Sequence, residues 1–373
     1  MPHDITRRSL LAAAAASPLV SAVAASAQEP TPDDEKVGFA VVGLGSYAMR
    51  QMLPRFKDTK LCKPTALVTG DPDAKGQRVA EQYDIAEDHV VTYDDMGKLA
   101  DMDDVQVVYV VTPTGLHLRD TLAGFKAGKH VLCEKPMAGS VDECQRMIDV
   151  GKEASRYLMI AYRVQYEPVN ARAIEYARTE ELGKVRLITG EIAYANNETG
   201  TWRKDPSLNG GGGPLMDLGI YMVQAHRYIA GEEPVRVSAK TYRPKDDPAF
   251  PEGVEGRVTW EFEFPSGVLA TGANAWDCGN TNRYAALCER GEFVLDPATA
   301  YGGKTMYAGG RRLDIDEGNQ FAAMLDHMAG CVREDKTPKT PGEEGRQDVY
   351  LMKKIYEAAA SGETLELENL RDG

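Results

Sequence analysis

Residues that bind transition metals are scarce in this 373-residue sequence. It has six cysteines and six histidines, and no two cysteines form a C-x-x-C pair. Zinc sites use thiolates and imidazoles at short, recognisable spacings, and no cluster of histidines supplies them here. The sequence therefore predicts no metal site, and we expect its cysteines to be free, buried thiols.

Positive charge is also in deficit. The chain has 43 Lys and Arg against 57 Asp and Glu, a formal net charge of −14 and a pI near 5.0. These charges are mixed along the sequence rather than gathered in blocks. Because such a surface repels nucleic acids and anionic membranes, we expect neither as a partner.

We expect no membrane anchor at the N-terminus. Its apolar, Ala-rich stretch is short and is interrupted by two serines and a proline. Arg7-Arg8 precedes the stretch, and residues 25–27 are Ala-Ser-Ala, a typical cleavage site. Residues 1–27 are predicted to be a twin-arginine export signal, which would make the protein periplasmic. An ordinary secretory signal with a chance arginine pair is the alternative. The polar, Pro-rich residues 28–36 are predicted to form an N-terminal arm.

What the chain does contain is enough apolar sequence, 43% of residues, for two domains. Over residues 37–162, short apolar runs alternate with amphipathic stretches. The predicted strands are 39–42, 65–68, 107–111, 130–133 and 158–161, and the predicted helices are 48–56, 74–82, 116–127 and 141–153. This alternation predicts a doubly wound parallel sheet of the Rossmann type.

The pattern changes after about residue 162. Residues 163–340 contain longer strands that alternate apolar and polar side chains, and they are predicted to form a substrate and oligomerisation domain. The predicted strands are 186–194, 235–242, 257–264, 267–275 and 284–289, and the predicted helices are 213–229 and 321–332. A last helix within residues 341–373 is expected to pack back on the first domain. The fold class is therefore α/β plus an α+β domain with an open antiparallel sheet.

A glycine motif follows the first apolar run. Residues 43–48 are Gly-Leu-Gly-Ser-Tyr-Ala, a G-x-G-x-x-A turn that leaves a strand and opens a helix. Gly43 permits the tight turn, and Gly45 lets the backbone approach a pyrophosphate. The helix N-terminus supplies N–H donors and a positive dipole. This context predicts a dinucleotide site that includes Leu44, Ser46 and Tyr47.

The end of the second strand distinguishes NADP from NAD. An NAD enzyme usually places a carboxylate there to bind the ribose diol, whereas this position holds Thr69 followed by Gly70. A hydroxyl and a backbone N–H can donate hydrogen bonds to a 2′-phosphate, which a carboxylate would repel, and Lys75 lies just beyond. NADP is therefore the predicted cofactor. The alternative is a shift of two residues that would make Asp71 the ribose ligand of NAD.

Residues 112–117, Thr-Pro-Thr-Gly-Leu-His, follow the 107–111 strand. At the carboxyl end of a parallel strand they should line the cofactor crevice, which predicts contacts from Thr112, Pro113, Leu116 and His117. His117 could also transfer protons. We expect instead that it opens a helix and packs near the cofactor.

The next strand ends in Glu134-Lys135-Pro136. A lysine there can hold its ammonium beside a nicotinamide and a substrate hydroxyl, where a cation stabilises a developing alkoxide. Pro136 restricts the local backbone and is a candidate for a cis peptide bond. A solvated surface lysine would be the simpler explanation, but the buried strand that precedes Lys135 argues against it.

A glycine-rich loop, residues 210–213, leads into a helix that carries Asp217 and Tyr221. These two residues are i,i+4 neighbours and share a face of the helix. A phenol is a poor base until a nearby ammonium lowers its pKa, and Lys135 could do this. Taken alone, the pair is better explained as a helix cap and a half-buried tyrosine.

Taken together, these stretches resemble the Gfo/Idh/MocA oxidoreductase family over residues 37–362. The likeness is greatest to its exported branch of glucose–fructose and aldose–aldose oxidoreductases. It places Lys135, Asp217 and Tyr221 on the family's catalytic positions and Trp202-Arg203 near the nicotinamide. It implies sugar contacts from Lys135, Arg163, Tyr166, Asp217 and Tyr221, with Glu134 and Arg163 also near the cofactor. Many relatives carry histidine where Tyr221 stands.

The resemblance implies small sugars as partners and a homo-oligomer. The short arm favours a dimer over a tetramer. The resemblance also implies a ping-pong reaction with tightly bound NADP. An aldose is oxidised to an aldonolactone, and the reduced cofactor then reduces a second sugar to an alditol. Two alternatives remain, an ordinary sugar or inositol dehydrogenase that releases its cofactor and a non-enzymatic binding protein.

Overall fold

The computed structural model of the protein describes residues 31–32 and 35–371. The predicted export signal, residues 1–27, and part of the 28–36 arm lie outside this range, so both stay predictions. Within the described range, no helix combines the length and the hydropathy that crossing a membrane requires.

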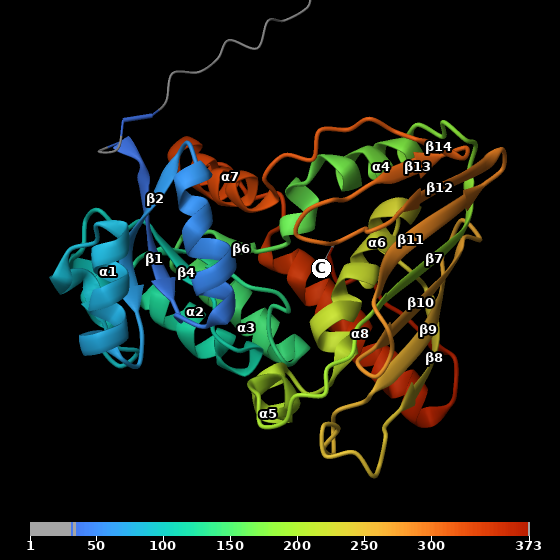
Figure 1. The fold of residues 1–373 in the computed structure, drawn as a ribbon, viewed down its shortest axis with the longest axis horizontal. Helices are drawn as coiled ribbons and strands as arrows, with labels where there is room; N and C mark the ends of the chain where they lie inside the picture. Colours follow the sequence, from blue (N-terminus) through green and yellow to red (C-terminus); the bar gives the residue numbers. More distant parts are fainter. Residues whose placement is uncertain (1–30, 33–34, 372–373) are drawn as a thin grey trace, which may run out of the picture.

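The first domain is a six-stranded parallel sheet in the order β3-β2-β1-β4-β5-β6 (Figure 1). Its strands are β1 Val37–Val42, β2 Cys62–Val68, β3 Val90–Val91, β4 Val107–Val110, β5 His130–Cys133 and β6 Leu158–Ile160. Its helices are α1 Gln77–Tyr83, α2 His117–Lys126 and α3 Val141–Glu153. This confirms the predicted Rossmann fold. The sequence analysis missed β3, because two residues are too few to show a pattern.

The second domain contains a nine-stranded sheet in the order β14-β13-β12-β11-β7-β10-β9-β8-β15. Its strands are β7 Val185–Ala193, β8 Arg236–Tyr242, β9 Arg257–Glu263, β10 Leu269–Ala275, β11 Thr281–Cys288, β12 Gly291–Leu295, β13 Met306–Ala308, β14 Arg311–Arg312 and β15 Leu365–Glu366. Its pairs are antiparallel except β7 with β10, which run parallel. The sheet is therefore mixed, whereas the sequence predicted an antiparallel one. The parallel pair could not be predicted, because a hairpin pattern does not show which distant strand becomes a neighbour.

In the part of the chain that the structure describes, helices cover one face of this sheet and leave the other open. Helices α4 Pro168–Arg178, α6 Ile220–Ala230 and α8 Gly342–Ser361 lie between it and the first domain, and the short α5 Pro206–Asn209 lies below α3, away from the sheet (Figure 1). On the open face, Leu187, Leu269 and Leu287 form a row across three adjacent strands and are 37–42% exposed. This row suits the predicted contact with a second copy, which stays a prediction.

The domain boundaries differ from the predicted ones at α7 Gln320–Glu334. This helix falls within residues 163–340 but packs on the first domain, where its side chains join the core beside β1 and β2. The reason is its apolar stripe of Phe321, Met324, Leu325 and Met328, which packs on the sheet face that the helical residues 48–58 and α1 also cover.

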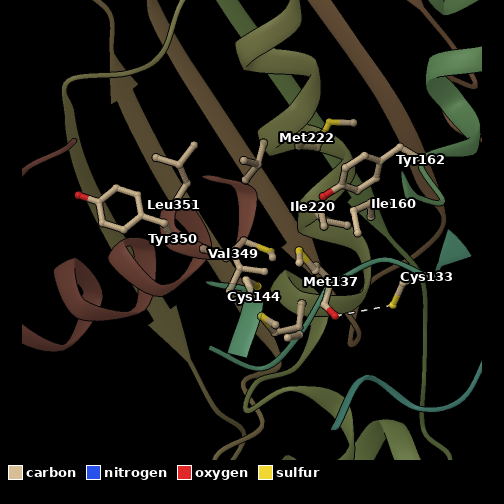
Figure 2. Close-up of a cluster of buried hydrophobic side chains, with 14 of the residues drawn as sticks. Cys133, Met137, Cys144, Ile160, Tyr162, Ile220, Met222, Val349, Tyr350 and Leu351 are labelled. Carbon is tan, nitrogen blue, oxygen red and sulfur yellow. Dashed lines mark hydrogen bonds between the residues drawn. The ribbon is translucent and has the colours of Figure 1, made fainter. Parts of the chain in front are cut away.

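Helix α8 contacts α3 and β6, as expected for a helix that packs back on the first domain. It also packs against α6 and β8 of the second domain. Figure 2 shows the shared core, in which Met137 and Ile160 of the first domain meet Ile220, Met222 and Val349. This continuous core fixes the strand ends of one domain relative to α6 of the other.

Candidate active site

A cavity of about 690 Å³ lies between the two domains at the carboxyl edge of the parallel sheet. Its walls come from the loops after β1, β4 and β5, from the start of α6, and from residues 296–301 after β12. Ten of the residues predicted from sequence line it, namely Tyr47, Thr112, His117, Glu134, Lys135, Arg163, Trp202, Arg203, Asp217 and Tyr221. Open α/β sheets bind ligands at this edge.

Lys135 lies at the centre of the cavity wall. It follows β5, and its peptide bond to Pro136 is cis, one of the two options that the sequence left open. Its Nζ donates to the backbone oxygen of Asp217 at 2.8 Å and lies 3.8 Å from Oδ1 of the same residue. It also lies 4.8 Å from the centre of the Tyr221 ring. The three predicted catalytic residues therefore meet, although 82 residues separate Lys135 from Asp217.

The Asp217 carboxylate is held between two cations. Arg203 Nε donates to its Oδ2 at 3.2 Å, opposite Lys135, and the Tyr194 hydroxyl donates to the same oxygen at 3.5 Å. Burial opposes ionisation of Asp217, but the charges of Arg203 and Lys135 outweigh it and hold its pKa below the ordinary value. Asp217 therefore orients its neighbours as an anion and is a poor acceptor for a substrate proton.

The helix that presents Asp217 and Tyr221 begins with a wide turn. Residues Leu215–Gly219 form a π-helical turn that continues into α6, and both side chains face the cavity. At its start, the buried Glu255 carboxylate accepts a hydrogen bond from Leu215 N at 3.0 Å and another from Tyr356 OH at 2.9 Å. Burial raises the pKa of Glu255 to about 7, and its carboxyl oxygen satisfies a free N–H group at the helix N-terminus and thereby fixes the direction of the turn.

His117 contacts backbone groups and has a structural role rather than one in proton transfer. It begins α2, its side chain is buried, and its ring nitrogens lie 2.9 Å from Pro136 O and 2.8 Å from Thr112 O. Both nitrogens thus face backbone carbonyl oxygens, and burial lowers the pKa of the ring, whose neutral form donates its one N–H to a single carbonyl at a time. The imidazole links the ends of β4 and β5 and supports the turn that carries Lys135, which agrees with the packing role expected from sequence.

Glu134 faces the same cavity from the end of β5. Its carboxylate accepts a hydrogen bond from Tyr109 OH at 2.5 Å and one from Lys135 N at 3.3 Å. Burial raises its pKa despite these bonds and the nearby Lys135 charge. The position therefore offers a buried carboxyl group close to where a nicotinamide would lie.

The glycine turn fits a dinucleotide. Gly43 has φ +99°, and a Cβ there would lie 3.0 Å from Thr112 Cγ2, so the turn requires glycine. A Cβ built on Gly45 meets nothing within 4 Å, which leaves room for a pyrophosphate against the backbone. The other predicted cofactor residues lie outside the cavity in the loops after β1, β2 and β4, namely Gly43, Leu44, Gly45, Ser46, Thr69, Gly70, Lys75, Pro113 and Leu116.

The end of β2 argues against Asp71 as a ribose ligand. Its Oδ1 accepts a hydrogen bond from Ala74 N at 3.2 Å and so caps the next helical turn. Thr69 is buried, and its hydroxyl accepts from Asp71 N at 3.3 Å. Gly70 is exposed, which makes its backbone and the nearby Lys75 the accessible groups for a 2′-phosphate.

Two predicted sugar contacts are placed differently. Tyr166 does not line the cavity, because its ring packs on His327 and its hydroxyl lies 3.0 Å from Thr340 Oγ1. Arg163 lines the cavity, but its NH2 donates to Thr299 O at 2.7 Å and its NH1 to Gln320 Oε1 at 2.5 Å. Both terminal nitrogens of Arg163 therefore donate to other protein groups rather than pointing to a sugar. The turn after β6 sets these directions, which side-chain order in the sequence does not show.

The far wall of the cavity consists of residues that no sequence motif predicted. This wall includes Tyr194 at the end of β7, Asn282 on β11, and Thr299 and Tyr301 after β12. A signal for Tyr194 existed, since it closes a predicted strand. Residues 296–301 form an irregular connection, and no pattern in the sequence marks them. Among residues 31–32 and 35–371, no group of three or more His, Cys, Asp or Glu side chains could hold a metal ion.

Comparisons with known proteins agree with this architecture. A model of the Gfo/Idh/MocA oxidoreductase family with an NAD-binding Rossmann fold matches residues 37–162, and one of the Gfo/Idh/MocA C-terminal domain matches residues 171–294. The crystal structure of aldose–aldose oxidoreductase from Caulobacter crescentus, complexed with glycerol, is 40% identical, with a TM-score of 0.86 over 89% of this chain and 100% of that chain.

Two curated relatives also match most of the chain. D-xylose 1-dehydrogenase (NADP(+)) of Haloarcula marismortui is 27% identical over 355 residues, 91% of this chain and 96% of the relative. D-xylose 1-dehydrogenase (NADP(+)) 2 of Haloferax volcanii is 28% identical over 338 residues, 88% of this chain and 99% of the relative.

Proposed function

We propose that this protein is a sugar oxidoreductase with tightly bound NADP that moves hydride from one sugar to another. The proposal starts from the family, because the chain belongs to the Gfo/Idh/MocA oxidoreductases. The observation that carries the proposal is the meeting of Lys135, Asp217 and Tyr221 in one cavity at the carboxyl edge of the dinucleotide sheet. The aldose–aldose relative supports the two-sugar reaction, and the relatives named for NADP support the cofactor.

Each side chain has a distinct task in this mechanism. When bound, the nicotinamide supplies hydride chemistry by accepting a hydride from sugar C1 and later returning one. Tyr221 takes the proton of the C1 hydroxyl, and Lys135 stabilises the oxyanion that develops there. Asp217 remains ionised and holds the ammonium of Lys135 and the guanidinium of Arg203 in place.

The two half-reactions balance without an outside oxidant. The first sugar loses a hydride and a proton and becomes an aldonolactone. The second sugar gains the hydride at its carbonyl carbon and the proton from Tyr221, and becomes an alditol. The protein thus returns to its starting protonation state, and the same residues serve in both directions.

The predicted export signal favours retention of the cofactor. The periplasm has no appreciable pool of NADP to bind from or release to, so an exported enzyme must bring its cofactor along. A twin-arginine signal permits this, because that route exports folded proteins. Reduced cofactor outside the cytoplasm is then reoxidised only by a second substrate on the same protein.

Sugar turnover without added nucleotide tests the proposal. After exhaustive dialysis, the protein is expected to convert aldoses to equal amounts of aldonic acid and alditol, measured by chromatography. The dialysed Tyr221→Phe variant serves as the control and should form little of either product. A wild-type protein that loses its nucleotide and consumes one mole of added NADP per mole of sugar would be an ordinary dehydrogenase, the function that the xylose dehydrogenase relatives favour.

Cofactor preference has its own test at the end of β2. Gly70 is exposed, and a Cβ there would lie 3.7 Å from Tyr93, an ordinary contact, so Gly70→Asp places a carboxylate near the adenosine ribose without a clash. We expect NADP affinity to fall by roughly 10-fold or more and NAD affinity to rise, because the carboxylate repels a 2′-phosphate and accepts a ribose diol.

Gly70→Asn is the matched control, because it adds similar bulk without charge. Affinities for both nucleotides are measured by titration of nucleotide-free protein. An equal loss of NADP affinity in the Asn and Asp variants would attribute the effect to size and remove the 2′-phosphate from this position.

A further inference from the structure

Residues 299–301, here called the clasp, cross from the second domain to the first beside the cavity. They follow β12, and Thr299, Ala300 and Tyr301 all line the cavity wall. On the side of the second domain, Asn282 Oδ1 accepts hydrogen bonds from Thr299 N at 2.9 Å and from Thr299 Oγ1 at 3.0 Å. This anchor ties the clasp to β11.

On the other side, two buried side chains hold three consecutive carbonyl groups of the clasp. Arg163 NH2 donates to Thr299 O at 2.7 Å, and Gln320 Nε2 donates to Ala300 O at 3.1 Å and to Tyr301 O at 2.9 Å. Arg163 follows β6, and Gln320 begins α7, which packs on the parallel sheet. The clasp is thereby joined to the first domain. Because these carbonyls are satisfied by buried donors, the clasp has a defined position rather than that of a free loop.

The side chain of Tyr301 extends this connection to the glycine turn. Its ring centre lies 5.5 Å from that of Phe321 on α7 and 6.4 Å from that of Tyr47, which follows Gly45 and Ser46. The Arg163 guanidinium lies 4.7 Å from the same ring. Tyr301 thus closes against the loop on which a dinucleotide pyrophosphate would rest.

The charge of Arg163 has no carboxylate partner in an ion pair among the described residues. Its Nε is buried without a hydrogen-bond partner. The guanidinium is therefore a buried cation without an ion pair, although its charge acts on the nearby Glu134 carboxyl, and such a cation favours an anionic occupant.

We propose that the clasp retains the nucleotide, with Tyr301 as a cofactor-binding residue that closes on the glycine turn and with Arg163 and Gln320 as positioning residues. This inference rests on the proposed function, because it concerns how the same cofactor stays bound. Release of the nucleotide requires the Tyr301 and Tyr47 rings to separate, and the hydrogen bonds from Arg163 and Gln320 oppose that movement.

The test compares dissociation rates of NADP from the full chain. Protein loaded with labelled NADP is mixed with excess unlabelled NADP, and the loss of label is followed. We expect Tyr301→Ala to release NADP on the order of tenfold faster than the wild type, the scale set by loss of aromatic packing. Tyr307→Ala is the matched control, because Tyr307 is 40% exposed on β13 and lies outside the cavity. It should release NADP at the wild-type rate.

A second variant tests the positioning role. Gln320→Ala should also release NADP faster, and the double variant should be no faster than Tyr301→Ala alone, because Gln320 acts through the clasp. Additive effects would overturn the positioning role. An unchanged rate in Tyr301→Ala would overturn the clasp and leave the two-sugar reaction intact. Rapid release by the wild type would instead contradict the tightly bound cofactor, and the ratio between variant and wild type would still decide the role of Tyr301.

Discussion

Tyr221→Phe is expected to lower sugar turnover by about 10²–10⁴-fold, the usual contribution of a positioned acid–base group. The substitution removes only the hydroxyl and leaves the ring that contacts Lys135 and Arg163. Lys135→Met should produce a comparable loss, because the developing oxyanion then lacks the ammonium beside it. Steady-state rates with saturating sugar measure both effects.

Both variants should keep their nucleotide, since neither residue belongs to the glycine turn. Absorbance of the purified proteins and quantification of extracted nucleotide measure this directly. Tyr228→Phe is the control, because it removes a hydroxyl from the same helix. Tyr228 OH donates a hydrogen bond of 2.8 Å to Glu344, and neither residue lines the cavity. It should keep near-normal turnover. Near-normal turnover in Tyr221→Phe would exclude Tyr221 as the base and leave Asp217 or water.

Arg227→Met is expected to cost about 3–5 kcal/mol of unfolding free energy, because it leaves the buried Asp348 carboxylate without its cation, whereas Glu233 and Glu344 keep Arg371. Arg227 lies on α6, six residues after Tyr221, and is 3% exposed. Its guanidinium contacts Asp348 at 2.5 Å, Glu344 at 2.9 Å and both oxygens of Glu233 at 2.7 Å. This network joins the helix that carries Tyr221 to α8.

The loss should depend on pH. Burial, only partly offset by Arg227, raises the pKa of Asp348 to about 6, above its unfolded value of 3.8. A raised carboxyl pKa favours the folded state at low pH, and that contribution is lost as pH rises through the folded pKa. Removal of Arg227 raises the pKa of Asp348 further. The variant should therefore be most destabilised near neutral pH and recover part of the loss as pH falls toward 5.

Urea unfolding at neutral and mildly acidic pH measures the effect. Arg186→Met is the control, because Arg186 pairs with Glu289 at the surface, where the side chains are 58% and 39% exposed. Such pairs contribute about 0–1 kcal/mol. A similar small loss in Arg227→Met would show that the buried network does not hold α6 against α8.

Local pattern was sufficient for the parts of the site that sit at strand ends. The sequence predicts the glycine turn, Glu134-Lys135-Pro136 and the Asp217–Tyr221 spacing as parts of the site, and the structure brings Lys135, Asp217 and Tyr221 to one cavity. This succeeded because the carboxyl ends of parallel strands meet at one edge of a sheet, so order along the chain predicts proximity in space. Helical spacing placed Asp217 and Tyr221 on one face even though the turn is π-helical.

Contacts between distant segments could not be derived in this way. The site also contains Tyr194 from the end of β7 and Tyr301 from an irregular connection, and Gln320 of helix α7 supports it. Their approach depends on how the two domains share one core. The sequence by itself determined the Rossmann fold and the dinucleotide turn, because these follow from periodicity and local backbone geometry, and its family resemblance indicated the three residues proposed for catalysis. Only the tertiary structure decided that Tyr166 faces Thr340, that Arg163 holds the clasp and that β7 runs parallel to β10. Those outcomes depend on packing across domains, where the direction of each side chain is set by neighbours far away in the sequence.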